Sequence, residues 1–183
     1  MMRVTGGSLR SRRVHAPRGR AVRPTPGRVR EALFSILGER IIDARILDLF
    51  AGTGALGFEA LSRGASAVTF VEANRQTAAS IERAARSFDV AQRARVIALP
   101  AERAVRMLTG RYDVVFADPP YATGVPDTVL HRLAAAGLID ERTTIVYEHS
   151  GRAATPELAG FAVTRTERYG DVALSFLRVD VDG

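Results

Sequence analysis

The sequence has no cysteine and no lysine, and its first 30 residues contain no acidic residue. The absence of cysteine excludes disulfide bonds and thiolate metal sites, which suits a reducing cytoplasm. No apolar run approaches the ~18 residues that a membrane span needs. The basic N-terminus has no apolar segment behind it that would make it a secretory signal. We therefore expect a soluble, cytoplasmic protein that does not enter a membrane.

Positive charge, by contrast, is concentrated at the start of the chain. The 183 residues, 46% of them hydrophobic, suffice for one domain with a sizeable core. Residues 1–30 hold nine arginines, and the remaining residues hold 17 arginines and 20 acids, so a strongly basic arm precedes a mildly acidic body. This asymmetry indicates that the protein binds a polyanion. The alternative is that the basic segment is a solvated tail without a partner. We predict an RNA-contacting arm over residues 1–24 and the main domain over residues 25–183.

The first 38 residues predict a hairpin and a helix. The stretch "MMRVTGGSLRSRRVHAP" alternates weakly around Gly6-Gly7, which is typical of a short β-hairpin followed by extended chain. The stretch "RPTPGRVREALFSILG" predicts a helix that Thr25 caps, with Pro26 in its first turn and Gly38 at its end.

Strands and helices then alternate along the chain. Strands are expected over residues 46–49, 67–72, 94–99, 112–118 and 143–149, and helices over 56–63, 75–88, 101–108 and 127–136. The last two apolar runs, 161–168 and 172–180, are joined by "YGD" and predict a hairpin. The pattern predicts an α/β, Rossmann-like fold: a mostly parallel seven-stranded sheet with an antiparallel C-terminal edge hairpin. Its ligand would lie beyond the carboxyl ends of the strands.

The stretch "ILDLFAGTGALG" (46–57) contains a glycine pattern that two chemistries share. Gly52, Gly54 and Gly57 fit the G-x-G-x-x-G spacing of a dinucleotide site, and the same loop can hold S-adenosylmethionine (SAM). Asp48 favours SAM, because a carboxylate there would repel a pyrophosphate but attract a sulfonium and an ammonium group. Glu72 ends the next strand and could accept the ribose hydroxyls of either ligand.

The stretch "VVFADPPY" (114–121) favours methyl transfer. The nitrogen of a base amino group is planar, and it becomes nucleophilic only when its hydrogens are held out of the ring plane. The Asp118 side chain and the Pro119 carbonyl could accept those hydrogens. Pro119 and Pro120 would fix the backbone, and Tyr121 could stack on the base. By itself Asp-Pro-Pro could also be an ordinary turn.

Together these motifs resemble those of the RsmD family of bacterial small-subunit ribosomal RNA guanine methyltransferases. The resemblance is carried by "RPTPGRVREALF" (23–34), "LDLFAGTGALGFEALSRGA" (47–65), "VTFVEAN" (68–74) and "DPPY" (118–121), in that order. It implies a class I SAM-dependent methyltransferase that modifies the exocyclic amino group of one guanine in 16S ribosomal RNA, within a 30S subunit or an assembly intermediate. The family usually has Thr-Asp or a similar pair where this chain has Pro26-Gly27.

The resemblance also assigns roles by position. The residues implied in catalysis are Asp118, Pro119, Pro120 and Tyr121. The residues implied in cofactor binding are Asp48, Phe50, Ala51, Gly52, Thr53, Gly54, Glu72, Ala73, Ala101, Glu102 and Asp118. The residues implied in RNA binding are Arg10, Arg12, Arg13, Arg18, Arg20, Arg23, Arg28 and Arg30.

Other functions stay open at this stage. Related amino methyltransferases act on DNA adenine or on a protein glutamine amide, and a non-catalytic RNA-binding assembly factor could use the same fold. A dehydrogenase is disfavoured, since nothing in the sequence resembles a hydride-acceptor site. His15, His131 and His149 are too scattered for a metal site, and we expect His149 and Tyr169 to serve in packing. The charge pattern gives no reason to expect more than a monomer.

Overall fold

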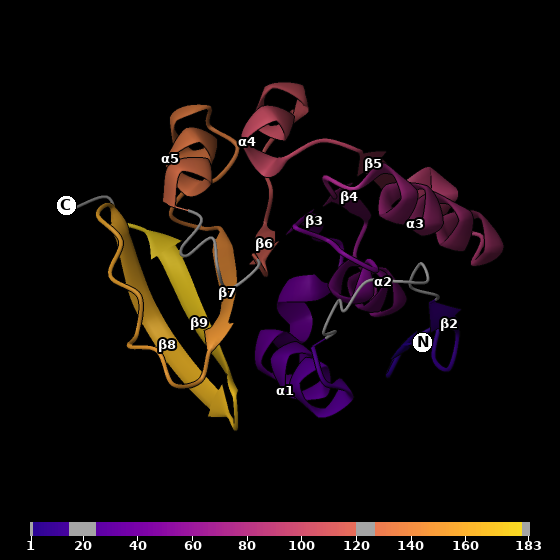
Figure 1. The fold of residues 1–183 in the computed structure, drawn as a ribbon, viewed down its shortest axis with the longest axis horizontal. Helices are drawn as coiled ribbons and strands as arrows, with labels where there is room; N and C mark the ends of the chain where they lie inside the picture. Colours follow the sequence, from indigo (N-terminus) through magenta and orange to yellow (C-terminus); the bar gives the residue numbers. More distant parts are fainter. Residues whose placement is uncertain (1, 15–24, 120–126, 181–183) are drawn as a thin grey trace.

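The computed structural model describes residues 2–14, 25–119 and 127–180. In this part of the chain one seven-stranded sheet has the order β5-β4-β3-β6-β7-β9-β8, and two short strands pair separately (Figure 1). The strands are β1 Met2–Arg3, β2 Arg13–Val14, β3 Arg45–Leu49, β4 Ala67–Val71, β5 Ala94–Ile97, β6 Val114–Ala117, β7 Thr144–Ser150, β8 Phe161–Tyr169 and β9 Val172–Val179. The helices are α1 Gly27–Leu37, α2 Ala55–Ser62, α3 Arg75–Ser87, α4 Ala101–Ala104 and α5 Asp127–Ala135, with 3-10 turns η1 Gly38–Ile41, η2 Ala91–Arg93 and η3 Val105–Met107.

The sheet confirms the predicted Rossmann-like fold. Strands β3 to β7 pair in parallel, while β9 runs antiparallel to β7 and β8 antiparallel to β9. The order reverses at β3, from which the chain proceeds to β4 and β5 on one side and later to β6 and β7 on the other. In such sheets the crevice at the reversal, beyond the carboxyl ends of the strands, is where ligands bind.

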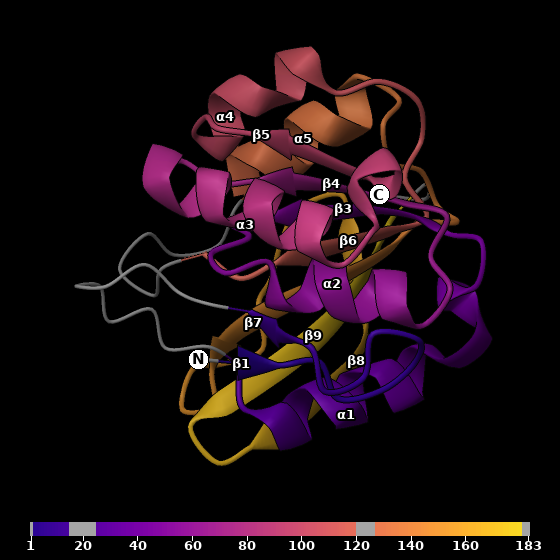
Figure 2. The same ribbon diagram turned by 90° about the vertical axis from the view of Figure 1, so that its right-hand side faces the viewer.

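Each face of the sheet is covered by its own hydrophobic cluster. One cluster joins the sheet to α1, α2, α3 and the N-terminal hairpin, and the other joins it to α4 and α5. Figure 2 shows α4 and α5 above β3, β4 and β6, and α1, α2 and β1 below these strands. Burial on both faces explains why the central strands read as continuous apolar runs.

The N-terminal hairpin is present, but its turn lies elsewhere than predicted. Met2 pairs with Val14, so Gly6-Gly7 lie within a wide loop rather than at a tight turn. This loop rests on the end of α2, where the Ser8 amide donates to the Ser62 carbonyl oxygen at 2.8 Å. The apolar side chains of the hairpin are buried in the core shared with α1 and α2: Met2, Val4, Leu9 and Val14. The hairpin is therefore packed onto the main domain.

Helix α1 begins without the predicted Thr25 cap. Pro26 occupies the N-cap position, and no side chain caps the helix. Thr25 is buried, and its hydroxyl instead donates to Glu148 Oε2 at 2.7 Å. A buried carboxylate is a stronger acceptor for this hydroxyl than solvent would be, so the threonine joins the start of α1 to β7.

In the described ranges, no helix is both long and apolar enough to cross a membrane.

Candidate active site

Three neighbouring strands, β3, β4 and β6, end side by side at one edge of the sheet, and β7 passes the same edge and continues to Ser150. The register aligns Leu49 with Val71 and Ala117, and Ala117 with Tyr147. The residue that follows each of these aligned positions therefore lies at the same edge. Those residues are Phe50, Glu72, Asp118 and Glu148, and Asp48 lies two positions before Phe50. Four carboxyl side chains from separate parts of the sequence thus meet where the fold places its ligand.

The loop between β3 and α2 has an unusual backbone. Phe50, Gly52 and Gly54 have φ of 58°, 54° and 78°, in the left-handed region. Glycine adopts this conformation without strain, whereas for phenylalanine it is costly and typical of a functional loop. A Cβ on Gly57 would lie 2.9 Å from Val68 Cγ1 and closer still to the Phe70 ring. The glycines therefore let the loop turn tightly and let α2 pack closely on β4.

Asp48 is held at the start of α2. Its side chain is buried, and Oδ2 accepts a hydrogen bond from the Gly57 amide at 3.0 Å. Burial, with a smaller contribution from the negative charge of Glu72, raises the pKa of Asp48 to about 8, although the Gly57 hydrogen bond opposes this shift. A cation placed beside Asp48 would favour the ionised carboxylate, so the group is suited to a positively charged ligand.

Glu72 closes the glycine loop onto the end of β4. Its Oε2 accepts from the Gly52 amide at 2.9 Å, and its Oε1 accepts from the Asn74 amide at 2.7 Å. Each carboxylate oxygen can accept a further hydrogen bond, so the predicted contact with ribose hydroxyls is compatible with these two. These two hydrogen bonds fix the glycine loop, a structural role for Glu72 that the sequence did not suggest.

Asp118 and Pro119 follow β6 directly. Asp118 is half-buried and Pro119 is buried. Burial raises the pKa of Asp118, and the negative charges of Glu148 and Asp48 raise it further. Pro120 and Tyr121, which complete the predicted motif, lie outside the described residues. The carboxyl of Asp118 is therefore presented at the same edge as Asp48 and Glu72.

The predicted cofactor residues beyond these carboxyls occupy the same edge. Ala51, Thr53 and Gly54 are buried in the glycine loop, and Ala73 is exposed directly after Glu72. Ala101 is buried at the first position of α4, with Glu102 exposed beside it. This helix follows β5, so it starts at the edge where the parallel strands end.

Glu148 was not among the predicted site residues. It is 5% exposed in β7, one strand away from Asp118, and it accepts the Thr25 hydrogen bond. The sequence carried one signal for it. Glu148 is a lone carboxylate in the apolar run "TIVYEH", one position beyond the strand residue that aligns with Ala117.

The predicted RNA-binding arginines occupy different environments. Arg10, Arg12, Arg13 and Arg28 are exposed, while Arg18, Arg20 and Arg23 lie outside the described residues. Arg30 corrects the prediction, because it is 3% exposed and donates to the carbonyl oxygens of Thr25 and Arg3. An arginine on the inward face of a helix is used in packing, so Arg30 does not present its charge to a phosphate here.

The wide loop of the hairpin reaches the end of the molecule away from the site. Arg12 lies over the ring of Phe88, which caps the C-terminal end of α3, with 5.9 Å between its guanidinium carbon and the ring centroid. The hairpin therefore runs along the α2 side of the domain (Figure 2), and Arg12 reaches the end of α3.

Two of the histidines and the tyrosine considered in the sequence, His131, His149 and Tyr169, contact other parts of the fold. His149 is buried, with Nε2 at 2.8 Å from Ser175 Oγ, and its ring stacks on Tyr147. Tyr169 packs against the first core cluster, and His131 is exposed near Asp127. Within residues 2–14, 25–119 and 127–180, no group of three or more His, Cys, Asp or Glu could hold a metal ion.

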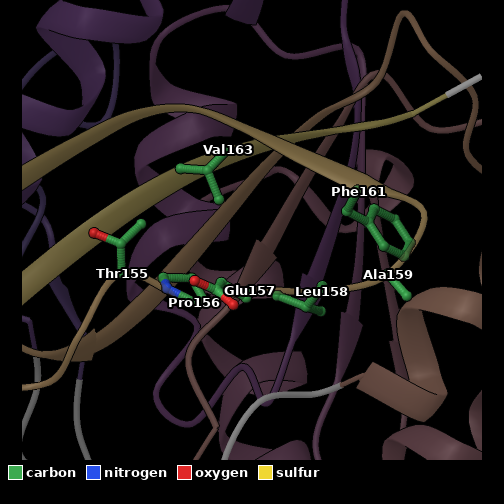
Figure 3. Close-up of a pocket in the computed structure, with 7 residues that line it drawn as sticks. All are labelled: Thr155, Pro156, Glu157, Leu158, Ala159, Phe161 and Val163. Carbon is green, nitrogen blue, oxygen red and sulfur yellow. The ribbon is translucent and has the colours of Figure 1, made fainter. Parts of the chain in front are cut away.

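A separate pocket of about 500 Å³ lies between the segment before β8 and β8 itself (Figure 3). Its lining residues are Thr155, Pro156, Glu157, Leu158, Ala159, Phe161 and Val163. None of the predicted site residues lines it.

Comparison with known proteins decides the family. Residues 2–178 match the family model described as conserved hypothetical protein 95. The ribosomal RNA small subunit methyltransferase D of Escherichia coli K12 is 32% identical over 183 residues, which covers 100% of this chain and 92% of the relative. The chain belongs to the RsmD family. Another protein of the same name, from Haemophilus influenzae, is 31% identical over 80% of this chain and 78% of its own length.

Solved structures share the architecture of this chain. The yhhF protein of Escherichia coli, named as a methyltransferase candidate, has a TM-score of 0.87 at 32% identity, covering 99% of both chains. An RNA methyltransferase from Salinibacter ruber, in complex with S-adenosyl-L-homocysteine, has a TM-score of 0.67 at 15% identity over 87% of this chain and 95% of that one. At that identity the second likeness shows the fold alone, which is that of a methyltransferase.

Proposed function

We propose that this RsmD-family protein is a SAM-dependent methyltransferase that modifies the exocyclic amino group of one guanine in 16S ribosomal RNA, within the 30S subunit or a precursor of it. The observation that carries the proposal is the meeting of Asp48, Glu72 and Asp118 at one sheet edge, around a glycine loop. The relatives named ribosomal RNA small subunit methyltransferase D support the substrate class.

The donor set of the site fits SAM. Asp48, buried and with a raised pKa, suits a ligand that carries positive charge. Glu72 has acceptor capacity for vicinal hydroxyls, and the glycine loop allows close approach of a ligand to the backbone. We propose that Asp48 and residues 50–54 hold the methionine part, Glu72 and Ala73 the ribose, and Ala101 and Glu102 the adenine. When bound, SAM supplies a methyl group activated by its sulfonium.

The chain's own contribution is alignment of the acceptor amine. Asp118 and the Pro119 carbonyl accept the two amino hydrogens and draw the nitrogen lone pair out of conjugation with the ring. Tyr121 stacks on the base, a contact of about 1–3 kcal/mol. A guanine stacked in RNA cannot reach this edge, so it is flipped out at a cost of a few kcal/mol. Asp118 acts as a hydrogen-bond acceptor and aligner, because the methylated amine loses its proton readily without a strong base.

The protonation state of Asp118 follows from its surroundings. With its pKa raised by burial and by Glu148 and Asp48, the free protein holds a proton at this edge near neutral pH. A cation bound beside Asp48 would lower the pKa of that carboxyl and release its proton. Asp118 would accept the amine hydrogens best when its own carboxyl is ionised.

Exposed arginines are proposed to grip the RNA backbone. Arg10, Arg12, Arg13 and Arg28 are exposed, and we propose the same role for Arg18, Arg20 and Arg23. Contact with about five phosphates gives a slope of roughly −4 in log affinity against log salt. Binding through this surface offsets the cost of flipping the base.

Radiolabelled SAM tests the proposal directly. The purified protein is incubated with tritiated SAM and 16S RNA, 30S subunits, duplex DNA or protein acceptors, and the label is mapped to a base. We expect label in one guanine of 16S RNA or of the 30S subunit, and the same guanine unmodified in cells that lack the protein. Label in DNA adenine or in a glutamine amide would contradict the substrate. Failure to bind SAM in isothermal titration would favour a non-catalytic RNA-binding factor.

A further inference from the structure

We propose that Glu148 is a positioning residue, which joins the end of the RNA-contacting arm to the catalytic Asp118 through the hydroxyl of Thr25. The inference rests on the proposed function, because it assigns a role at the same site. On this proposal, the geometry around Asp118 depends on the position of Thr25, at the start of the main domain.

The first observation is the bond between Thr25 and Glu148. Their side chains are 4% and 5% exposed, and the Thr25 hydroxyl donates to Glu148 Oε2 at 2.7 Å. Thr25 is the first described residue after the arm, and Glu148 lies 123 residues later in β7. A charge-assisted hydrogen bond between two buried side chains holds both in one orientation.

The second observation is that Arg30 braces the same point. Its two terminal nitrogens donate to the Thr25 carbonyl oxygen at 2.7 Å and to the Arg3 carbonyl oxygen at 2.8 Å. The guanidinium thus connects the hairpin, the end of the arm and the first turn of α1. Its positive charge lies near enough to Glu148 for the two to attract each other. The N-terminal segment therefore sets the position of Thr25. It also sets the position of the hydroxyl whose hydrogen bond Glu148 accepts.

The third observation is that Glu148 lies beside Asp118. Ala117 and Tyr147 are partners in the parallel register, and Asp118 and Glu148 are the residues that follow them at the same edge. The charged groups that act on Asp118 are Glu148 from β7 and Asp48 from β3. The charge of Arg30 from α1 also interacts with that of Glu148. Any change in the charge of Glu148 therefore changes the proton affinity of Asp118.

The first test substitutes Glu148→Gln, which keeps the shape and an acceptor for Thr25 but removes the charge. We expect the acid limb of the kcat/KM profile to move to lower pH, by roughly one pH unit for removal of one adjacent like charge. Glu141→Gln is the control, since Glu141 is exposed in the turn before the same strand. An acid limb that stays in place in Glu148→Gln would overturn the proposal, since a purely structural residue would lower stability without moving the limb.

The second test breaks the link from the other end. Thr25→Val removes the hydroxyl and keeps the shape, whereas Thr25→Ser keeps the hydroxyl. We expect Thr25→Val to raise KM for ribosomal RNA several-fold with KM for SAM unchanged, and Thr25→Ser to restore the wild-type value. Equal KM values for RNA in Thr25→Val and the wild type would overturn the arm's part in the proposal.

A readout without turnover separates this inference from the proposed function. Carboxyl carbons labelled with ¹³C in the ligand-free protein report the titration of Asp118, which is assigned with Asp118→Asn. We expect Glu148→Gln to lower its midpoint, whether or not the protein methylates RNA. An unchanged midpoint would overturn the inference. Inactivity of the wild-type protein on every acceptor, together with a shifted midpoint, would contradict the proposed function alone.

Discussion

The two halves of the candidate site are held together by different parts of the chain. In the half around β3 and β4, the carboxyls of Asp48 and Glu72 are bound by amides of Gly57, Gly52 and Asn74, which lie within 20 residues of them. In the half around β6 and β7, Glu148 is bound by Thr25, 123 residues away. We call these the cofactor half and the acceptor half after their proposed roles: the first is built by local backbone, whereas the second is completed by the N-terminal segment.

The largest expected effect is the loss of Asp118 from the acceptor half. Asp118→Ala removes an acceptor aimed at the reacting amine, so we expect kcat to fall on the order of 10²–10³-fold. The cofactor half is untouched, so SAM affinity measured by isothermal titration changes little. Single-turnover methylation with saturating SAM measures the loss.

Asp118→Asn is the control for this prediction. The amide keeps an acceptor oxygen in the same position but loses the charge, so we expect an activity between those of the wild type and the alanine variant. Equal, severe losses in both variants would show that Asp118 works as a base rather than as an aligner. Near wild-type turnover in Asp118→Ala would remove it from the mechanism.

In the cofactor half, we expect the substitution Gly57→Ala to lower both stability and SAM affinity. Alanine there would force its Cβ into the Phe70 ring and Val68, and overpacking of this kind costs about 1–3 kcal/mol of unfolding free energy. It would also displace the amide that Asp48 accepts, so we expect weaker SAM binding. Denaturant unfolding and isothermal titration measure the two effects.

Gly27 supplies the comparison for Gly57, because both lie in helices. A Cβ on Gly27 would meet only Thr5 Cγ2, at 4.0 Å, so Gly27→Ala is expected to leave stability equal or to raise it by about 0.4–1 kcal/mol. Similar stability in the two alanine variants would show that close packing of α2 on β4 does not require a glycine.

The same contrast explains which features the sequence could predict. Alternating apolar runs and glycine stops predicted the succession of strands and helices and the mostly parallel sheet, because the β/α pattern reflects burial on both faces of such a sheet. Asp48, Glu72 and Asp118 could be predicted because each sits at a strand end, in or next to a local motif. Whether they touch the cofactor or the base stays a prediction.

The features that the sequence did not predict depend on contacts between distant segments. Thr25 resembles a helix cap, but it faces a carboxylate of β7 that only the folded sheet brings near. Arg30 resembles one more arginine of the basic arm, but it lies on the inward face of α1. Helical periodicity could have identified Arg30, because it neighbours Val29 and Leu33 on the buried side. The Thr25–Glu148 pairing had no local signal.

The raised pKa of Asp48 predicts a pH-dependent stability in the cofactor half. Its pKa is about 8 in the folded protein against an ordinary value of 3.8, so the folded state binds the proton more tightly than the unfolded state does. Between these values the unfolding free energy falls as pH rises, by about 1.4 kcal/mol per pH unit for this one group. We expect Asp48→Asn to reduce that slope between pH 5 and 7, as measured by denaturant unfolding of the ligand-free protein.

Glu82→Gln is the control for this slope, because Glu82 is exposed on α3. Its profile should follow the wild type. A wild-type profile that is flat or rises over this pH range would contradict the burial of a protonated Asp48. Any pH dependence of the unfolding free energy that remains in Asp48→Asn would come from Asp118. We expect that remaining slope to disappear in the double variant Asp48→Asn with Asp118→Asn.

The smallest expected effect concerns the arm that completes the acceptor half. Arg10 and Arg13 are exposed on the hairpin, and if each meets one phosphate, the double alanine variant reduces the slope of log affinity against log salt by about 1.4–1.8. Arg106→Ala with Arg142→Ala is the control, because both arginines are exposed elsewhere, in η3 and in the turn before β7. Filter binding of 16S RNA at several salt concentrations measures the slopes, with SAM affinity expected to stay unchanged. Equal slopes in the two double variants would place the RNA away from the hairpin. The hydrogen bonds that connect Arg3, Arg30 and Thr25 would then stabilise the acceptor half without responding to RNA binding.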